Sequence, residues 1–324
     1  MNFKINDKGV AEGFCLVKSS EKRVSAKGGA YLDIILADKT GEINGKIWDY
    51  DEQAFGVYEA GDLVKVRGLV SKYNGVDQIK IDRIRKAMDM DGVSPADFAP
   101  QAAYEGDVMY DELISVANAI ENTDIKAIVL EIYKENKEKL LYWPAAFKLH
   151  HAIRCGLLMH VLSIVRLCEK VCEIYPSINK DLLIAGAMLH DIGKIYEYDV
   201  NSVGTANGYT VEGNLIGHLV KGAIIIEKTA EKLGIGGEVP MLLQHMMISH
   251  HGEPEFGASV RPSFIEAEIL SSLDTLDAKI YEMAEAVSSV ETGDFSGKLW
   301  ALDNRKLYNH GMNAVETTVK LFEE

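Results

Sequence analysis

Residues 182–194 read LLIAGAMLHDIGK, an apolar segment that ends in a histidine, an aspartate, a glycine and a lysine. The apolar spacing predicts a buried helix, and a charged aspartate at the end of such a helix must be paired or bound to a metal. Gly193 lets the backbone turn sharply directly after the pair. Because adjacent side chains at a helix end can both reach one ion, His190 and Asp191 are predicted metal ligands.

Histidine is concentrated around this segment. Eight of the nine histidines lie between residues 150 and 251, and the first 149 residues contain none. His160 lies in the apolar segment GLLMHVLSIV, and Asp274 lies in AEILSSLDTLDAKI. Imidazole and carboxylate are the ligands that divalent Mn, Fe, Co, Ni and Zn prefer. The pattern therefore predicts a metal site to which three separate helices contribute.

Apolar residues at spacings of three and four predict that the carboxy-terminal part is entirely helical. Two helices are expected within residues 110–140, and five more over residues 156–175, 180–189, 211–233, 239–250 and 262–288.

Residues 9–85 instead alternate apolar and polar side chains, as in Leu32, Ile34 and Leu36. This period of two predicts half-buried strands, and Asn74-Gly75 is a strong hairpin signal between two of them. Five strands in about 80 residues suit a small barrel, and their order resembles the OB-fold modules that bind single-stranded nucleic acid.

Such modules combine a basic groove with aromatic side chains on which bases stack. The candidates are Tyr31, Trp48 and Tyr73 for stacking, and Lys46, Lys65, Arg67, Lys72 and Lys80 for phosphate contacts. The alternative is that the aromatic residues belong to the barrel core and the lysines to a solvated face.

Charge is distributed unevenly over a chain whose net charge is -15. Residues 1–90 carry 15 Lys and Arg against 14 Asp and Glu, whereas the remainder carries 19 against 35. The amino-terminal part is thus spared the acidity that would repel an anionic partner. Residues 89–107 are rich in Asp, Ala, Pro and Gly and predict a linker. We expect a barrel over residues 1–88, this linker, and a helical metal domain over residues 108–324.

No apolar run approaches the roughly 18 residues that cross a bilayer, and the start MNFKINDKG lacks the apolar stretch of a signal peptide. We therefore expect a cytoplasmic protein without a membrane partner. Whether it forms a homo-oligomer is left open.

The spacing of His160, the His190-Asp191 pair and Asp274 resembles the H…HD…D pattern of the HD phosphohydrolase superfamily. This resemblance implies an all-helical domain that holds a divalent metal through those four side chains. Asp277 shares a helix face with Asp274, and a swap between the two is an alternative.

His218 in EGNLIGH and the pair in SHHG are similar to those of superfamily members with two metals. The resemblance implies a first ion on His160, His190, Asp191 and Asp274, and a second on Asp191, His218, His250 and His251. Two ions about 3.5 to 4 Å apart can generate hydroxide at neutral pH and stabilise the attacking and leaving oxygens of a phosphodiester.

Three further residues are catalytic candidates. Lys194 is placed to touch a phosphate oxygen or to protonate a leaving group, although helix ends also attract lysines that lie on the surface. His151 and Arg154 could form a cationic wall against the substrate phosphate, or serve in capping and packing instead.

An OB-like module, a linker and a two-metal HD domain together resemble the YhaM-type 3′→5′ exoribonuclease family. The strings HHAIRCGLLMH, YPSINKDLLIAGAMLHDIGK, YTVEGNLIGH, LLQHMMISHHG and EAEILSSLDTLDAK carry this resemblance, which covers essentially the whole chain. It implies two ions of Mn, or of Co, Fe, Ni or Mg. It also implies release of nucleoside monophosphates from the 3′ end of single-stranded RNA, with single-stranded DNA as a further substrate. The acidity of the helical domain departs from this expectation, because it leaves the RNA without an obvious basic track near the site.

Three other functions remain open. The chain could hydrolyse nucleotides or cyclic dinucleotides, with the OB-like domain binding a partner. Alternatively, it could be a diiron oxygenase, since His-rich HD sites can hold redox iron, or a nucleic-acid-binding protein with an inactive HD site.

Overall fold

The computed structural model describes all of the chain except residues 1–2, 7–8, 26–27, 40, 74–75, 95–96, 99–100, 148–150, 202, 289, 316–319 and 321–324. The chain divides into two compact units. The first comprises Met1–Gln101 with Val200–Asn207, and the second comprises Ala102–Asp199 with Gly208–Glu324.

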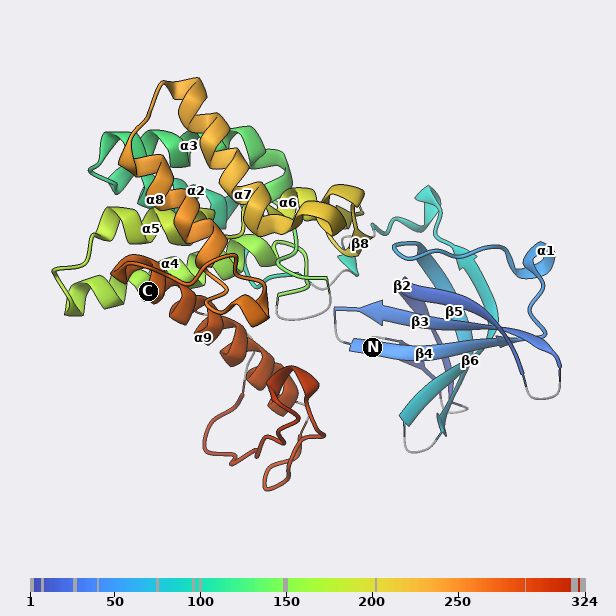
Figure 1. Cartoon of the computed structure of the whole chain (residues 1–324). Helices are drawn as coiled ribbons and strands as arrows, with labels where there is room; N and C mark the ends of the chain where they lie inside the picture. Colours follow the sequence, from blue (N-terminus) through green and yellow to red (C-terminus); the bar gives the residue numbers. More distant parts are fainter. Residues whose placement is uncertain are drawn as a thin grey trace. The chain divides into compact units, whose positions relative to one another are not determined.

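The first unit is a closed barrel (Figure 1). Its strands are β1 (Lys4–Ile5), β2 (Val10–Val24), β3 (Ala30–Asp38), β4 (Gly41–Trp48), β5 (Leu63–Tyr73) and β6 (Val76–Lys86), with the short helix α1 (Glu52–Phe55) after β4. The sheet order is β1-β2-β3-β4-β6-β5, and β2 also pairs with β5, which closes the sheet on itself. β4 and β6 are parallel. The predicted five-stranded OB-like barrel is confirmed in β2 to β6.

Alternation along each strand decides which side chains fill this barrel. Ile34, Ile47 and Ile79 are fully buried in its core, whereas Lys46 and Trp48 alternate with Ile47 and face outward. A bulge lies between Arg67 and Gly68 in the pairing of β5 with β6. A Cβ atom on Gly68 would lie 2.3 Å from the Lys80 carbonyl oxygen, so only glycine fits this close approach.

The second unit is mainly helical, as the sequence predicts. Its helices are α2 (Gly106–Ala119), α3 (Thr123–Leu140), α4 (Gly156–Ile174), α5 (Lys180–Leu189), α6 (Lys194–Glu197), α7 (Val211–Leu233), α8 (Glu238–Ser249) and α9 (Ile265–Ser288). Side chains that accept from freed backbone N–H groups mark three helix starts, namely Asn122 before α3, Asn179 before α5 and Thr210 before α7.

The structure differs from the all-helical expectation at residues 198–209. β7 (Tyr198–Val200) and β8 (Ala206–Tyr209) form a two-stranded sheet there, and Val203 between them packs against Leu16 and Leu63. Asn, Gly and Thr in this stretch favour turns rather than a helix, because they provide no apolar helix face.

α4 and α5 form the centre of the helical unit. Residues 156–165 of α4 are all buried, as is α5 from Leu182 to Leu189. A helix that is buried all round lies inside its domain, and α4 and α5 pack against each other and against α9. This packing brings polar residues of three helices into one interior. None of the helices in the described residues is long and apolar enough to span a membrane.

Candidate metal centre

Four donor side chains from three helices converge in the interior of the helical unit. His160 lies in the middle of α4, His190 and Asp191 directly follow α5, and Asp274 lies on α9. His160 Nε2 is 3.2 Å from His190 Nε2 and 3.1 Å from Asp274 Oδ1. Asp191 Oδ2 is 3.6 Å from His160 Nε2 and 3.3 Å from His190 Nε2. Atoms at these separations can share one ion at bond lengths of about 2.0 to 2.2 Å.

A second group of donors lies on the other side of Asp191. His218, His250 and His251 each offer a ring nitrogen, and these atoms all lie within 4.8 Å of one another. Asp191 Oδ1 is 3.7 Å from Nε2 of both His218 and His250. One oxygen of Asp191 therefore faces the first group, and the other faces the second.

Each of these histidines is oriented through its other nitrogen. In three of them Nδ1 donates to a backbone carbonyl: His190 to Ala187 at 2.8 Å, His250 to Met247 at 2.8 Å and His251 to Phe256 at 2.9 Å. In the other two Nδ1 donates to a carboxylate: His160 to Asp277 at 2.8 Å and His218 to Glu197 at 3.0 Å. A proton held on Nδ1 leaves the lone pair on Nε2, the usual arrangement around a metal. All five Nε2 atoms are thus available as ligands.

Asp277 orients His160 of the first group through Nδ1, the ring nitrogen that faces away from the other ligands. It accepts hydrogen bonds from Nδ1 of His160, from Nε2 of His151 at 3.1 Å, and from the hydroxyl of Ser163. Asp274, one helical turn earlier, faces Nε2 of His160 instead. The two acids therefore lie on opposite edges of the same imidazole.

Glu197 orients His218 of the second group in the same way, and it was not among the predicted site residues. Its Oε1 accepts from both the backbone N–H and Nδ1 of His218. This pairing requires a break in α7, which Gly217 supplies at a φ of 71°. A Cβ on Gly193 would lie 2.2 Å from the His218 carbonyl oxygen, so the turn after Asp191 must pass very close to α7. The only available signal was the position of Glu197 one helical turn after Lys194.

Lys194 is buried beside Asp191, with its Nζ 2.6 Å from Asp191 Oδ2. Burial acts to lower the pKa of Lys194, but the charge of Asp191 outweighs it, and the pKa is raised. Burial acts to raise the pKa of Asp191, yet Lys194 and His190 hold it well below its usual range. The backbone here is fixed by Trp143, whose indole N–H donates to the Lys194 carbonyl at 2.9 Å.

The centre has the chemical character of a divalent-metal site. Neither oxygen of Asp191 has a partner with hydrogen-bond geometry among the described residues, nor has Nε2 of His250, although all three atoms are buried. Such atoms are rare in folded proteins unless an ion or water satisfies them. Burial also holds the pKa of His250 well below its usual range, so its imidazole is neutral and able to ligate. The residues present therefore fit divalent cations.

His151 and Arg154, the remaining catalytic candidates, have the following partners. His151 is fully buried, with Nε2 on Asp277 and its ring against Tyr281 at 4.1 Å between centroids. The Arg154 guanidinium lies 5.7 Å from the centroid of the Tyr142 ring.

Three nucleic-acid candidates meet on the outer face of β3 and β4. Tyr31 and Trp48 are cross-strand partners with ring centroids 5.0 Å apart, and Lys46 Nζ lies 4.8 Å from the Tyr31 ring. Trp48 is 43% exposed. Strands two and three of an OB barrel, here β3 and β4, form the face on which such modules bind oligonucleotides.

The other candidates lie on β5. Lys65 and Arg67 alternate with the buried Val64 and Val66, and Lys65 lies 3.4 Å from Glu12. Lys72 is exposed, and the side chain of Tyr73 lies outside the described residues. On β6, Lys80 is exposed and is the parallel-strand partner of Lys46.

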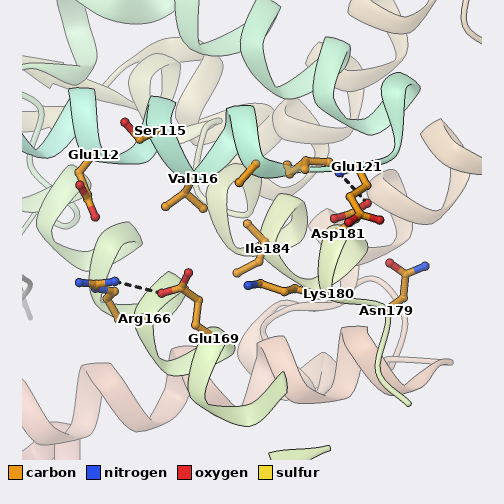
Figure 2. A pocket seen from close by; sticks show the side chains of 12 residues that line it. Glu112, Ser115, Val116, Glu121, Arg166, Glu169, Asn179, Lys180, Asp181 and Ile184 are labelled. Atoms are coloured by element: carbon orange, nitrogen blue, oxygen red, sulfur yellow. Dashed lines mark hydrogen bonds and ion pairs between the residues drawn. The ribbon is translucent and has the colours of Figure 1, made fainter. Parts of the chain in front are cut away.

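A cavity of about 580 Å³ lies elsewhere in the helical unit, between α2, α4 and the start of α5 (Figure 2). Three of its charged groups are engaged with one another or with the backbone. Arg166 pairs with Glu169 at 3.2 Å, and Asp181 accepts from the N–H groups of Glu121 and Asn122. None of the residues of the metal centre lines this cavity.

The two units correspond to two known families. Residues 17–87 match the OB-fold nucleic acid binding domain family, and residues 157–279 match the HD domain family. The chain is therefore an OB-fold protein with a helical HD domain, a class of domain that binds divalent metal.

Relatives that align over almost the whole chain identify the family within this class. The chain is 38% identical over 301 residues to "3'-5' exoribonuclease YhaM" of Listeria innocua, covering 92% of this chain and 94% of that protein. The protein of the same name from Geobacillus sp. is 39% identical over 295 residues, covering 91% of this chain and 90% of that protein. The second OB-fold domain of replication protein A from Methanococcus maripaludis is 24% identical with a TM-score of 0.22, covering 26% of this chain and 94% of that chain. The chain belongs to the YhaM family of 3′-5′ exoribonucleases.

Proposed function

We propose that this protein is a metal-dependent 3′→5′ exoribonuclease that removes nucleoside monophosphates from single-stranded RNA. Asp191 carries the proposal, because its two oxygens face two separate groups of donor atoms. The whole-chain relatives named for this activity support the same assignment.

The chain's residues would hold two divalent ions. His160, His190, Asp191 and Asp274 would hold the first, and Asp191, His218, His250 and His251 the second. When bound, such ions supply Lewis acidity and lower the pKa of water toward neutrality. Soft thiolates are absent from both groups, and nitrogen and carboxylate oxygen suit Mn, with Co, Fe, Ni and Mg as alternatives.

Burial indicates the side from which the substrate enters. His160, His190 and His250 are fully buried, whereas His218, His251 and Asp274 are partly exposed. The scissile phosphate would therefore approach past these three side chains. The Lys194 Nζ lies 2.6 Å from Asp191 Oδ2, so this side chain is placed to steady the negative charge developing on the phosphate.

The barrel would hold the single strand. Tyr31 and Trp48 offer a stacking surface and Lys46 a phosphate contact, which together bind a strand with little sequence preference. Single-stranded DNA can use the same contacts and is a second proposed substrate. A cytoplasmic location is part of this proposal, because the proposed substrate is RNA.

Labelled RNA tests the proposal. A 20-nucleotide RNA is labelled at its 5′ end in one sample and at its 3′ end in another, and is incubated with Mn, with Mg or with a chelator. The 5′ label should give a ladder that shortens step by step, and the 3′ label should appear at once as mononucleotide. Chelator and Asp191→Ala should each abolish both patterns.

Two results would contradict the proposal. Internal fragments from either label would indicate an endonuclease. Hydrolysis of free nucleotides or cyclic dinucleotides with intact RNA would instead assign the site to small molecules.

A further inference from the structure

The segment after α9 folds back on itself as a short hairpin over residues 293–309 (Figure 1). Ser296 N–H donates to the Leu307 carbonyl at 2.8 Å, and Asn309 N–H donates to the Asp294 carbonyl at 3.0 Å. The turn of 3-10 helix η4 (Trp300–Leu302) forms its tip, where Leu302 is 2% exposed and anchors the loop. We call this segment the basic–aromatic hairpin.

Three large aromatic side chains of the hairpin face solvent. Trp300 is 75% exposed, Phe295 is 61% exposed and Tyr308 is 50% exposed. Phe295 and Tyr308 are partners across the hairpin, with ring centroids 5.0 Å apart. Solvated surfaces seldom carry three such rings together, and aromatic rings gathered on a polar segment are typical of surfaces on which bases stack.

Three cations accompany these rings. The segment FSGKLWALDNRKLY, residues 295–308, contains Lys298, Arg305 and Lys306 against the single acid Asp303. All three are exposed, and within the part of the chain that the structure describes, none of them lies in an ion pair. Their charge is therefore available to an anionic partner.

This positive segment stands out against an acidic background, because residues 91–324 carry 19 Lys and Arg against 35 Asp and Glu. It also lies beyond residues 157–279, the range that matches the HD family. α9 connects it to the metal centre. Asp274 and Ser288, the last residue of α9, are about 21 Å apart at the helical rise of 1.5 Å per residue. That distance equals about six stacked nucleotides at 3.4 Å each.

We infer that the basic–aromatic hairpin is a second binding element for single-stranded RNA, which holds the substrate several nucleotides upstream of the 3′ end. The inference rests on the proposed function. Lys298, Arg305 and Lys306 contact phosphates, and Trp300 with Phe295 and Tyr308 stacks on bases. The hairpin thereby supplies the basic contact that the acidic surroundings of the metal centre lack.

Binding is measured on the full-length protein in EDTA, so that no cleavage occurs, by the fluorescence anisotropy of a 5′-labelled 20-nucleotide oligouridylate. The charge variant is Lys298→Gln, Arg305→Gln and Lys306→Gln together, and the stacking variant is Trp300→Ala. The matched control is Lys134→Gln, Lys170→Gln and Lys228→Gln, which removes the same charge from exposed positions on α3, α4 and α7.

The stacking variant should bind about five- to 160-fold more weakly, the range expected for one lost base–aromatic contact. In the charge variant, the slope of log affinity against log salt should fall by about two, at about 0.7 for each lost phosphate contact on a single strand. The control should match the wild type. In Mn, both hairpin variants should degrade a trinucleotide at the wild-type rate, because three nucleotides cannot reach the hairpin.

Wild-type affinity in both hairpin variants would overturn the inference, and so would equal losses in the control. A change in sedimentation with RNA affinity unchanged would assign the hairpin to contacts between copies of the chain, which also overturns it. The two proposals fail separately. RNA binding that depends on the hairpin without stepwise degradation refutes only the proposed activity, and degradation without hairpin dependence refutes only this inference.

Discussion

Asp277→Asn tests whether the first group of ligands is held in place from behind. The carboxylate accepts from His160 Nδ1 at 2.8 Å and from His151 Nε2 at 3.1 Å on one oxygen, and from the Ser163 hydroxyl on the other. An asparagine can keep its oxygen toward the two imidazoles and its amide toward Ser163, since a hydroxyl also accepts. The substitution therefore retains the shape of the contact and removes its charge.

The expected loss of metal affinity follows from that loss of charge. A hydrogen bond to a charged acceptor contributes about 1.5 to 3 kcal/mol, against about 0.5 to 1.5 kcal/mol for a neutral one. The difference of about 1 to 1.5 kcal/mol makes His160 a poorer ligand and weakens the first ion about tenfold. This value lies at the lower end of the 10- to 100-fold effect typical of residues that orient metal ligands. The second ion should be little affected.

The assay is a titration of metal-free protein with Mn²⁺, in which free Mn²⁺ is followed by electron paramagnetic resonance. Glu197→Gln provides the reciprocal case, because Glu197 holds His218 and should weaken only the second ion. Glu169→Gln, which removes an acid that pairs with Arg166 on the same helix as His160, should change neither constant. Unchanged Mn²⁺ affinities in Asp277→Asn would refute the reasoning. Equal weakening of both ions by Asp277→Asn and by Glu197→Gln would refute the division into two groups.

Three further outcomes are expected. The Asp191→Ala variant should lose both ions, as measured by elemental analysis, while the circular dichroism of the barrel is retained. A metal content of two ions per chain would show that Asp191 is not shared between the two ions. Gly193→Ala should displace the His218 backbone, since its Cβ would lie 2.2 Å from that carbonyl oxygen. A destabilisation of about 1 to 3 kcal/mol in urea unfolding, with a weakened second ion, is therefore expected, and wild-type values would disprove the close approach. Trp48→Ala should weaken single-stranded RNA binding by about 1 to 3 kcal/mol in EDTA. An equal loss in the conservative Trp48→Phe would show that stacking on this ring is not the cause.

The element order was predictable because it depends on local periodicity. Alternation over residues 9–85 predicted the strands of the barrel, and apolar spacings of three and four predicted the seven long helices of the second unit. β7 and β8 were not predicted, because their few residues show no period, and Val203 is buried by residues distant in sequence, Leu16 and Leu63 among them.

The residues of the candidate site were likewise predictable only in part. His190 and Asp191 could be singled out because they are adjacent at the end of an apolar helix. Glu197 could not, since a glutamate in a short polar turn gives no sign that a kink at Gly217 will bring His218 to it. Asp274 and Asp277 share a helix face at the level of sequence, and only the structure distinguishes them. Asp274 faces Nε2 of His160, whereas Asp277 contacts Nδ1 of His160 together with His151 and Ser163.

The sequence by itself determined which helices and strands form and which side chains are able to bind a metal. These properties follow from hydrophobic periodicity and from the chemistry of imidazole and carboxylate. Only the tertiary structure decided which atom of each side chain faces inward. Orientation depends on partners such as Asp277 and Glu197, which the fold brings close from 117 and 21 residues away. The same holds for the basic–aromatic hairpin, whose rings and cations become one surface only when residues 293–309 fold back on themselves.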